Sequence, residues 1–294
     1  MSAQLKYSFK KESALFFRRY HLLGIALAIF GFAIADPLIC RAMDTLMKMA
    51  NEMQAPTQTA QIAASPGGLT GAAGLEGMMS MFQSAAFVFS YTLVQLASYS
   101  LLIIMLVIRS AAGGEQKKRA MIVPLCSGLK YKNYLIPKFV IYPLSTFALT
   151  FLGGLTAGGL CNSLFKIDRV GFGMTAFGAL IMAVYTAFIV TVYLSLGLCT
   201  SRPGLMVGAV YLGQLFLQSF LDAMGLSDYQ PFTLISAAGS IFTAGDDFEL
   251  SQKMPSIFTA MGLCVVICVL MYFLALGVLG AKKIDNTAED KPAF

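Results

Sequence analysis

Long apolar runs alternate with short polar segments along the whole chain. Six of these runs contain about 20 residues, the length that an α-helix needs to cross the hydrocarbon core of a bilayer. We therefore predict membrane-spanning helices at approximately residues 21–41, 83–108, 138–160, 173–199, 204–222 and 257–281. The predicted fold class is an all-α, polytopic membrane protein, with a transmembrane domain over residues 21–281.

Two of the segments between the predicted spans are long, residues 42–82 and residues 223–256, and both are expected to be outside loops. The middle of the first is rich in Gly and Ala, a composition typical of flexible segments. The second contains an apolar stretch from Pro231 to Phe242 that is too short to cross a bilayer. This stretch predicts a re-entrant hairpin before the last span.

The first 20 residues have an amphipathic pattern at helical spacing. Leu5, Phe9, Ser13, Phe16 and Tyr20 share one face of a helix, and the basic residues lie elsewhere. Such a pattern predicts an interfacial helix lying on the cytoplasmic leaflet over residues 1–20. A frayed basic tail is the alternative interpretation. Residues 282–294 are expected to form a cytoplasmic tail.

Composition and charge agree with a membrane protein and indicate its orientation. Hydrophobic residues make up 57% of the 294 positions and charged residues 12%, with a mean hydropathy of +0.72, whereas soluble domains carry roughly 25% charged residues. With both termini in the cytoplasm, 16 of the 21 Lys and Arg residues lie on the cytoplasmic side. The five outside are Arg41, Lys48, Lys166, Arg169 and Lys253. The net charge of +6 therefore reflects topology and does not indicate binding to nucleic acid.

The sequence offers no catalytic or metal site, so we do not expect an enzyme. It contains one His, His21, and neither a GxxxxGK[ST] nucleotide loop nor an HExxH pair. Ser127 to Lys130 match an SxxK motif that has no partner motif, which we interpret as coincidence. The six Cys residues form no CxxC pair. Methionines crowd the first outside loop, where an apolar face is a better interpretation than a copper(I) site.

Polar side chains follow one face of two predicted spans. They are Tyr91, Gln95 and Ser98 on the second span, and Tyr211, Gln214 and Gln218 on the fifth. Polar groups are costly against lipid, so these faces should point toward protein or water. They are either a translocation path or protomer interface, or ordinary hydrogen bonds between helices of one subunit. Gly154 and Gly158 on the third span predict close helix approach.

The segment between the second and third spans is the most informative stretch of the sequence. It begins at Arg109, continues through the charged run from Glu115 to Arg119 and the sequence Pro-Leu-Cys-Ser at 124–127, and ends at Lys138. Together with the basic amphipathic N-terminus, the six spans and the final Lys282-Lys283 pair, it resembles the permeases of the ABC type-2 exporter family. The Gly-rich loop at 42–82 departs from the shortest members of that family.

The resemblance implies a transport subunit that is driven by another chain. A coupling helix at approximately 114–123 would enter a cleft of an ABC ATPase, with Glu115, Lys118, Arg119 and Ile122 at the contact. ATP and Mg²⁺ would be bound by that partner, and this chain would hold no cofactor. A path needs two bundles, so we expect a homodimer or a second permease. The expected location is the bacterial plasma membrane.

The sequence therefore predicts the permease of an ABC exporter for a hydrophobic, amphipathic or peptide-like substrate. The main alternative is an ion-coupled secondary transporter, which would place charges near the middle of the bilayer. Asp36 precedes Pro37, and we expect the pair to end the first span near the outer interface, where the carboxylate is hydrated. A membrane-embedded hydrolase and a non-transporting anchor for an ATPase are weaker alternatives.

Overall fold

The computed structural model describes residues 3–58, 81–114, 130–200, 202–225, 230–241 and 250–281. Every regular element within these ranges is a helix, and none of these residues belongs to a strand. Six of the helical segments are long and apolar enough to cross a membrane. The predicted all-α fold with six candidate spans is therefore confirmed, and the chain has the features of a multi-pass membrane protein.

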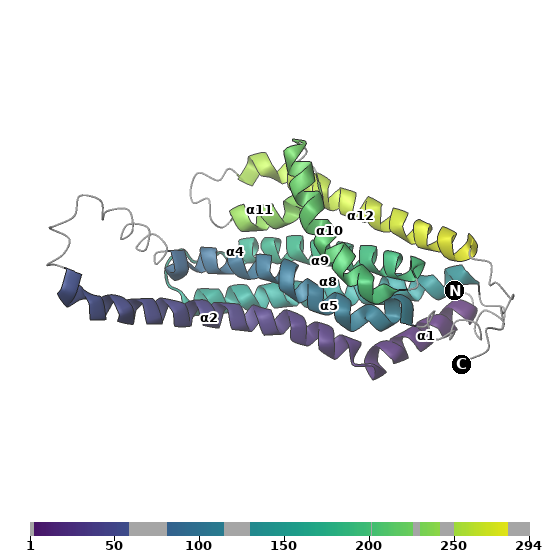
Figure 1. Ribbon diagram of the computed structural model, residues 1–294, viewed down its shortest axis with the longest axis horizontal. Coiled ribbons are helices and arrows are strands. Elements are labelled where there is room, and N and C mark those ends of the chain that lie inside the picture. The colour runs from purple at the N-terminus through teal and green to yellow at the C-terminus, as the bar shows by residue number, and fades with distance from the viewer. Residues whose placement is uncertain are drawn as a thin grey trace, which may run out of the picture.

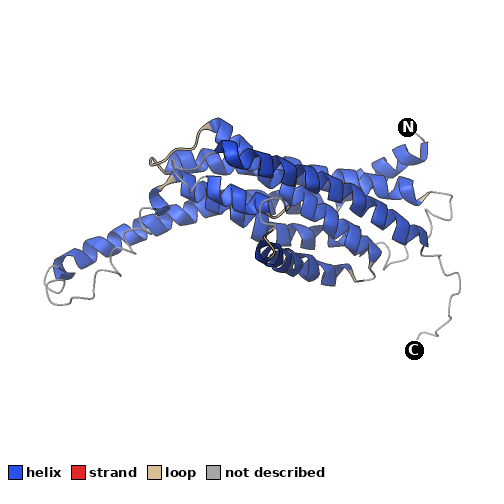
Figure 2. Ribbon diagram, turned by 90° about the horizontal axis from the view of Figure 1, so that it is seen from above, coloured by secondary structure: helices blue, strands red, loops and turns tan. Residues whose placement is uncertain are grey.

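The helices pack into one elongated bundle (Figure 1). In chain order they are α1 (Ala3–Arg18), α2 (His21–Gln58), α4 (Ala85–Gln95), the π-helical turn η2 (Leu96–Ser100), α5 (Leu101–Arg109), a second π-helical turn η3 (Ser110–Gly114), α8 (Tyr131–Leu164), α9 (Phe172–Cys199), α10 (Pro203–Ala223), α11 (Thr233–Ile241) and α12 (Leu250–Ala281). Most of the long helices follow the long axis of the bundle, and α10 crosses it steeply (Figure 1). Helix α1 and the last turn of α12 lie at the same end, called the α1 end below (Figures 1 and 2).

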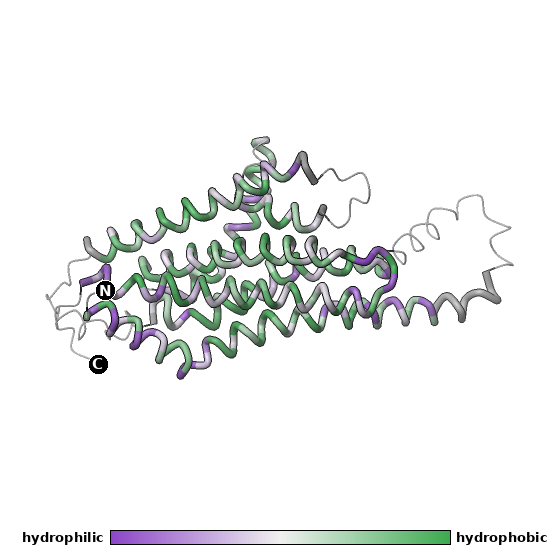
Figure 3. Tube along the Cα trace, turned by 180° about the vertical axis from the view of Figure 1, so that it is seen from behind, coloured by the Kyte–Doolittle hydropathy of each residue, from purple (hydrophilic) through white to green (hydrophobic). Residues whose placement is uncertain are grey.

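Helix α9 forms the centre of the bundle, and α10 and α12 are the least buried of the candidate spans. Helices α8 and α9 pack closely because glycines face the contact. A Cβ atom at Gly154 would stand 2.7 Å from the Cβ of Ala179, and one at Gly158 would overlap the methyl group of Thr175. The close approach predicted from these two glycines is confirmed. Apolar residues dominate the lengths of the helices, and polar ones gather near the turns (Figure 3).

Helix α2 is longer than the sequence predicted. We expected it to end near residue 41, but it continues through Pro37 to Gln58, so residues 42–58 of the expected loop are helical. A proline removes one backbone hydrogen bond, and the residues after it can still continue the helix. The Asp44 carboxylate accepts hydrogen bonds from Arg41, at 3.1 Å, and Lys48, at 2.9 Å, which are its neighbours on the helix surface.

Asp36 consequently lies inside a helix and not at its end. Its side chain is 9% exposed, and its Oδ2 atom has no hydrogen-bond partner among the described residues. The prediction of a hydrated carboxylate was wrong, because it depended on Pro37 ending the helix. Cys40 and Cys161, which are close to Asp36, are also buried.

The N-terminal segment forms helix α1, and its buried residues share only Phe16 with the predicted face. The buried residues are Ser8, Glu12 and Phe16. Of the predicted face, Leu5, Phe9 and Ser13 are half-buried, whereas Tyr20 follows the helix with a left-handed backbone (φ 56°) and is 72% exposed. The helix packs on α8 and α2, so its buried face covers protein.

The apolar stretch at 231–242 contains the short helix α11, which packs on α4, α9 and α12. Its Leu234, Ala237 and Ala238 side chains are buried, and the Ser90 hydroxyl of α4 donates a hydrogen bond to the Gly239 carbonyl at 2.8 Å. The predicted coupling helix at 114–123 lies, apart from Gly114, outside the described residues. Both of its flanks, η3 and the start of α8, are described.

Candidate functional site

A buried ion pair holds α1 against the bundle. The Lys138 ammonium of α8 donates hydrogen bonds to Oε1 of Glu12, at 3.2 Å, and to the carbonyl of Ala111 in η3, at 3.1 Å. The side chains of Lys138 and Glu12 are 0% and 4% exposed. The ammonium also lies over the Tyr134 ring, 5.1 Å from its centroid. One cation therefore connects α1, η3 and α8.

His21 makes a second connection beside this pair. Its Nδ1 atom is hydrogen-bonded to the Tyr142 hydroxyl of α8 at 3.0 Å, and its Nε2 atom to the Ser110 hydroxyl of η3 at 2.9 Å. The ring of Phe16 in α1 packs edge-on against Tyr142, with centroids 5.2 Å apart. These contacts add α2 to the set of connected elements. We call Glu12, His21, Ser110, Lys138 and Tyr142 the polar junction.

The polar junction joins the two flanks of the segment 115–129. Element η3 ends at Gly114, immediately before this segment, and α8 begins at Tyr131, just after it. Ser110 and Ala111 belong to the first flank and Lys138 to the second, and all three take part in the hydrogen bonds described above. A force applied to residues 115–129 would thus reach α1, α2 and α8 together. The predicted contact residues Glu115, Lys118, Arg119 and Ile122 lie outside the described residues.

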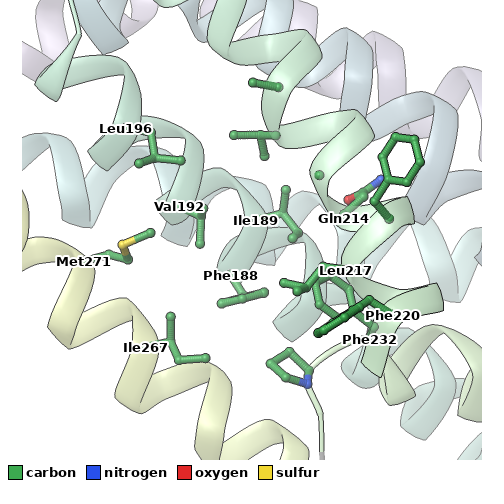
Figure 4. Close-up of a pocket in the computed structure, with 15 residues that line it drawn as sticks. Phe188, Ile189, Val192, Leu196, Gln214, Leu217, Phe220, Phe232, Ile267 and Met271 are labelled. Carbon is green, nitrogen blue, oxygen red and sulfur yellow. The ribbon is translucent and has the colours of Figure 1, made fainter. Parts of the chain in front are cut away.

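An apolar cavity of about 750 Å³ lies between α9, α10 and α12. Its wall is formed by Phe188, Ile189, Val192 and Leu196 of α9, by Ala209, Val210, Gly213, Gln214, Phe216, Leu217 and Phe220 of α10, by Ile267 and Met271 of α12, and by Pro231 and Phe232 (Figure 4). Gln214 is the one polar side chain in this wall. A second hollow of about 440 Å³ lies between α8, α9 and α12, and Phe188 borders both.

Of the residues predicted on the fifth span, Gln214 lines the cavity. It is buried, and its Oε1 atom accepts a hydrogen bond from the Tyr185 hydroxyl of α9 at 3.2 Å. This bond is one of the contacts between helices that the sequence left open as an alternative. Gln218 and Tyr211, also on α10, are half-buried and do not belong to the wall.

The residues predicted on the second span differ in their exposure. Tyr91 is 42% exposed, while Gln95 and Ser98 are half-buried. The π-helical turn η2 begins at Leu96 and changes the rotation per residue. The spacing from Tyr91 to Ser98 therefore does not keep to one α-helical face. Within the described ranges, no hydrogen bond connects these three side chains to Tyr211, Gln214 or Gln218.

The sequence interpretation missed the polar junction, although it contained two signals. Glu12 is the one acidic residue among the first 20, and His21 is the one His of the chain. The cavity had no such signal, because the residues that line it are of the same types as those that face lipid. Comparisons of the chain with models of protein families, with curated proteins and with solved structures found no match. The function is therefore inferred from the geometry of the polar junction and the cavity.

Proposed function

We propose that this chain is the permease subunit of an ABC exporter, moving a hydrophobic, amphipathic or peptide-like substrate. ATP would be bound and hydrolysed, with Mg²⁺, by a separate ATPase subunit. In this proposal the protein lies in a bacterial plasma membrane with both termini in the cytoplasm. Helix α1 lies at the cytoplasmic surface, and α11 is the helical part of a re-entrant hairpin.

The polar junction is the observation that carries this proposal. A subunit driven by a separate motor needs a contact segment whose movement reaches several spans at once. Residues 115–129 link η3 to α8 in the sequence, and Lys138 and His21 connect these two elements to α1 and α2. The charged run from Glu115 to Arg119 gives this segment the groups for a polar contact with a partner.

Transmission of the movement follows from the burial of the polar junction. A buried charge that loses its partner costs several kcal/mol, about 3–5 in measured cases. Glu12 and Lys138 therefore stay paired while the elements that carry them move. We propose that α1, η3 and the start of α8 shift as one body when the partner closes. Two such bundles, from a homodimer or from a second permease, would enclose the path.

The test is whether charge reversal in 115–129 removes the stimulation of ATP hydrolysis by the substrate. Glu115→Lys and Arg119→Glu should leave the amount of permease in the membrane unchanged and should lower substrate-stimulated ATPase activity in membranes that contain both subunits. Lys166→Glu, at an exposed site in the α8–α9 connection, is the matched control. The proposal would be contradicted if the wild-type chain, purified from its native membranes, brought no nucleotide-hydrolysing protein with it.

An ion-coupled secondary transporter is the second candidate, and Asp36 is the observation that favours it. Its carboxylate is buried within a candidate span and has an oxygen with no hydrogen-bond partner among the described residues. Such groups often bind or carry ions. Asp36→Asn should abolish transport driven by an ion gradient, and should leave ATP-driven export in place. The two candidates therefore give opposite results for the same substitution.

A further inference from the structure

The cavity between α9, α10 and α12 holds an amide that is only half paired. Oε1 of Gln214 accepts the hydrogen bond from Tyr185, whereas its Nε2 atom has no partner among the described residues. The side chain is 6% exposed. The Nε2 atom is not fully enclosed by the described protein, so an acceptor can reach it. The other side chains that line the cavity are apolar and offer no acceptor.

The cavity reaches the lipid-facing surface of the bundle. Phe216, Leu217 and Phe220 of α10 line it and are also exposed at that surface. Figure 4 shows Leu217 and Phe220 on one side of the space, with Ile267 and Met271 of α12 facing them. Helices α10 and α12 are the least buried candidate spans, so in a membrane their outer sides meet hydrocarbon. A molecule can thus enter from the bilayer without passing through water.

The amide lies near the middle of its span. Gln214 is about 16 Å along α10 from Pro203, at 1.5 Å per residue, and the candidate span runs from Pro203 to Leu221.

We propose that this cavity binds an acylated amphiphile that enters from the surrounding bilayer. The hydrocarbon chain fills the space between α9, α10 and α12, and an ester or amide carbonyl accepts the free hydrogen bond of Gln214 Nε2. The volume of about 750 Å³ lies within the 300–1,000 Å³ range of ligand sites. A plain alkane would satisfy the wall but not the amide. That the bound amphiphile is the exported substrate rests on the proposed function; the binding itself does not.

Two glycines on α10 provide a matched pair of variants. Gly213 lines the cavity, and a Cβ atom at this position meets no atom within 4 Å, so Gly213→Leu adds a side chain to the cavity wall with room for its Cβ atom. Gly208 is equally open but lies outside the wall, which makes Gly208→Leu the control on the same helix. Gln214→Leu removes the amide and keeps a side chain of similar length.

The experiment uses the purified full-length chain in phosphatidylcholine nanodiscs, with methyl palmitate carrying a diazirine at the end of its chain as the photoprobe. We expect labelling on α9 and α12 peptides that include Val192 or Ile267, both in the cavity wall. Unlabelled methyl palmitate should reduce the labelling at a concentration about threefold or more lower than hexadecane does. This is the ratio expected from one hydrogen bond in a membrane. Gln214→Leu should remove this difference.

Gly213→Leu should lower the labelling at least fivefold, and Gly208→Leu should leave it at the wild-type level. Labelling spread evenly over the lipid-facing helices, or unchanged in Gly213→Leu, would overturn the proposal. So would a second copy of the chain occupying the cavity, detected as disulfide-linked dimers of Leu217→Cys. If Gly213→Leu does not fold, the test is the competition experiment on the wild-type chain. Equal competition by methyl palmitate and hexadecane would then overturn the proposal. No ATPase is present, so a negative result leaves the proposed coupling untouched.

Discussion

The polar junction and the cavity differ in how completely their polar groups are paired. In the junction, a buried cation, a carboxylate, an imidazole and hydroxyls satisfy one another across four elements. In the cavity, one amide faces apolar side chains, and its Nε2 donor has no partner among the residues that the structure describes. A satisfied network is rigid and tolerates little change, whereas an open donor in an apolar space has room for a ligand. The α1 end is therefore suited to transmit movement, and the cavity to accept a molecule.

The largest effect is expected from breaking the junction at its ion pair. Lys138→Met leaves the Glu12 carboxylate buried without its cation, a change that costs about 3 kcal/mol or more. Because α1 can regain hydration for Glu12 by leaving the bundle, the cost should appear as detachment of α1. Hydrogen exchange of the α1 amides, measured by mass spectrometry, should become roughly 100-fold faster.

Two variants separate this effect from a general loss of stability. Lys132→Met removes an exposed cation about two turns earlier on α8 and should leave the exchange of α1 unchanged. The double variant Glu12→Gln, Lys138→Met has no buried charge and should exchange more slowly than Lys138→Met alone. Equal exchange in the single and double variants would show that the two groups are not coupled.

A smaller effect is expected at His21, where no charged pair is broken. His21→Phe keeps an aromatic ring next to Phe16 and loses the hydrogen bonds to Tyr142 and Ser110. Two hydrogen bonds contribute about 1–2 kcal/mol in total. The thermal midpoint of the purified protein should fall by a few degrees. His21→Gln can keep one of the hydrogen bonds, so its thermal midpoint should lie between those of His21→Phe and the wild type. An unchanged thermal midpoint in both variants would contradict the role of His21.

The sequence predicted the helices well, because a span is encoded by the local run of apolar residues. The C-terminal end of α2 was predicted wrongly. Pro37 was expected to end the helix, and the Arg41–Asp44–Lys48 contacts form only because the helix continues past it. The pairing of Glu12 with Lys138 joins residues 126 positions apart, and no local pattern reports such a contact. The cavity depends on which apolar side chains fail to fill a space, a property of packing and not of residue type.

A third substitution tests whether the amide of the cavity also stabilises the fold. Gln214→Leu removes its bond to the Tyr185 hydroxyl, and such bonds between membrane helices contribute about 0.6 kcal/mol on average. We expect a loss of that size in unfolding experiments, and a smaller further loss when Tyr185→Phe is added. A loss above about 2 kcal/mol would assign Gln214 a mainly structural role and weaken the cavity as a binding site.

The smallest effect on stability is expected at Gln218, one turn from Gln214 on α10. Its side chain is half-buried, makes no hydrogen bond to a described residue and does not line the cavity. Gln218→Leu should therefore change the free energy of unfolding by less than about 0.5 kcal/mol, as for substitutions away from packed features. If the polar face of α10 belongs to a path that two bundles enclose, export should still fall several-fold while the amount of protein in the membrane stays constant. Replacing a polar side chain in the wall of such a path should change export. Unchanged export would therefore show that Gln218 does not line a path, and would leave Gln214 and the cavity as the functional part of this face.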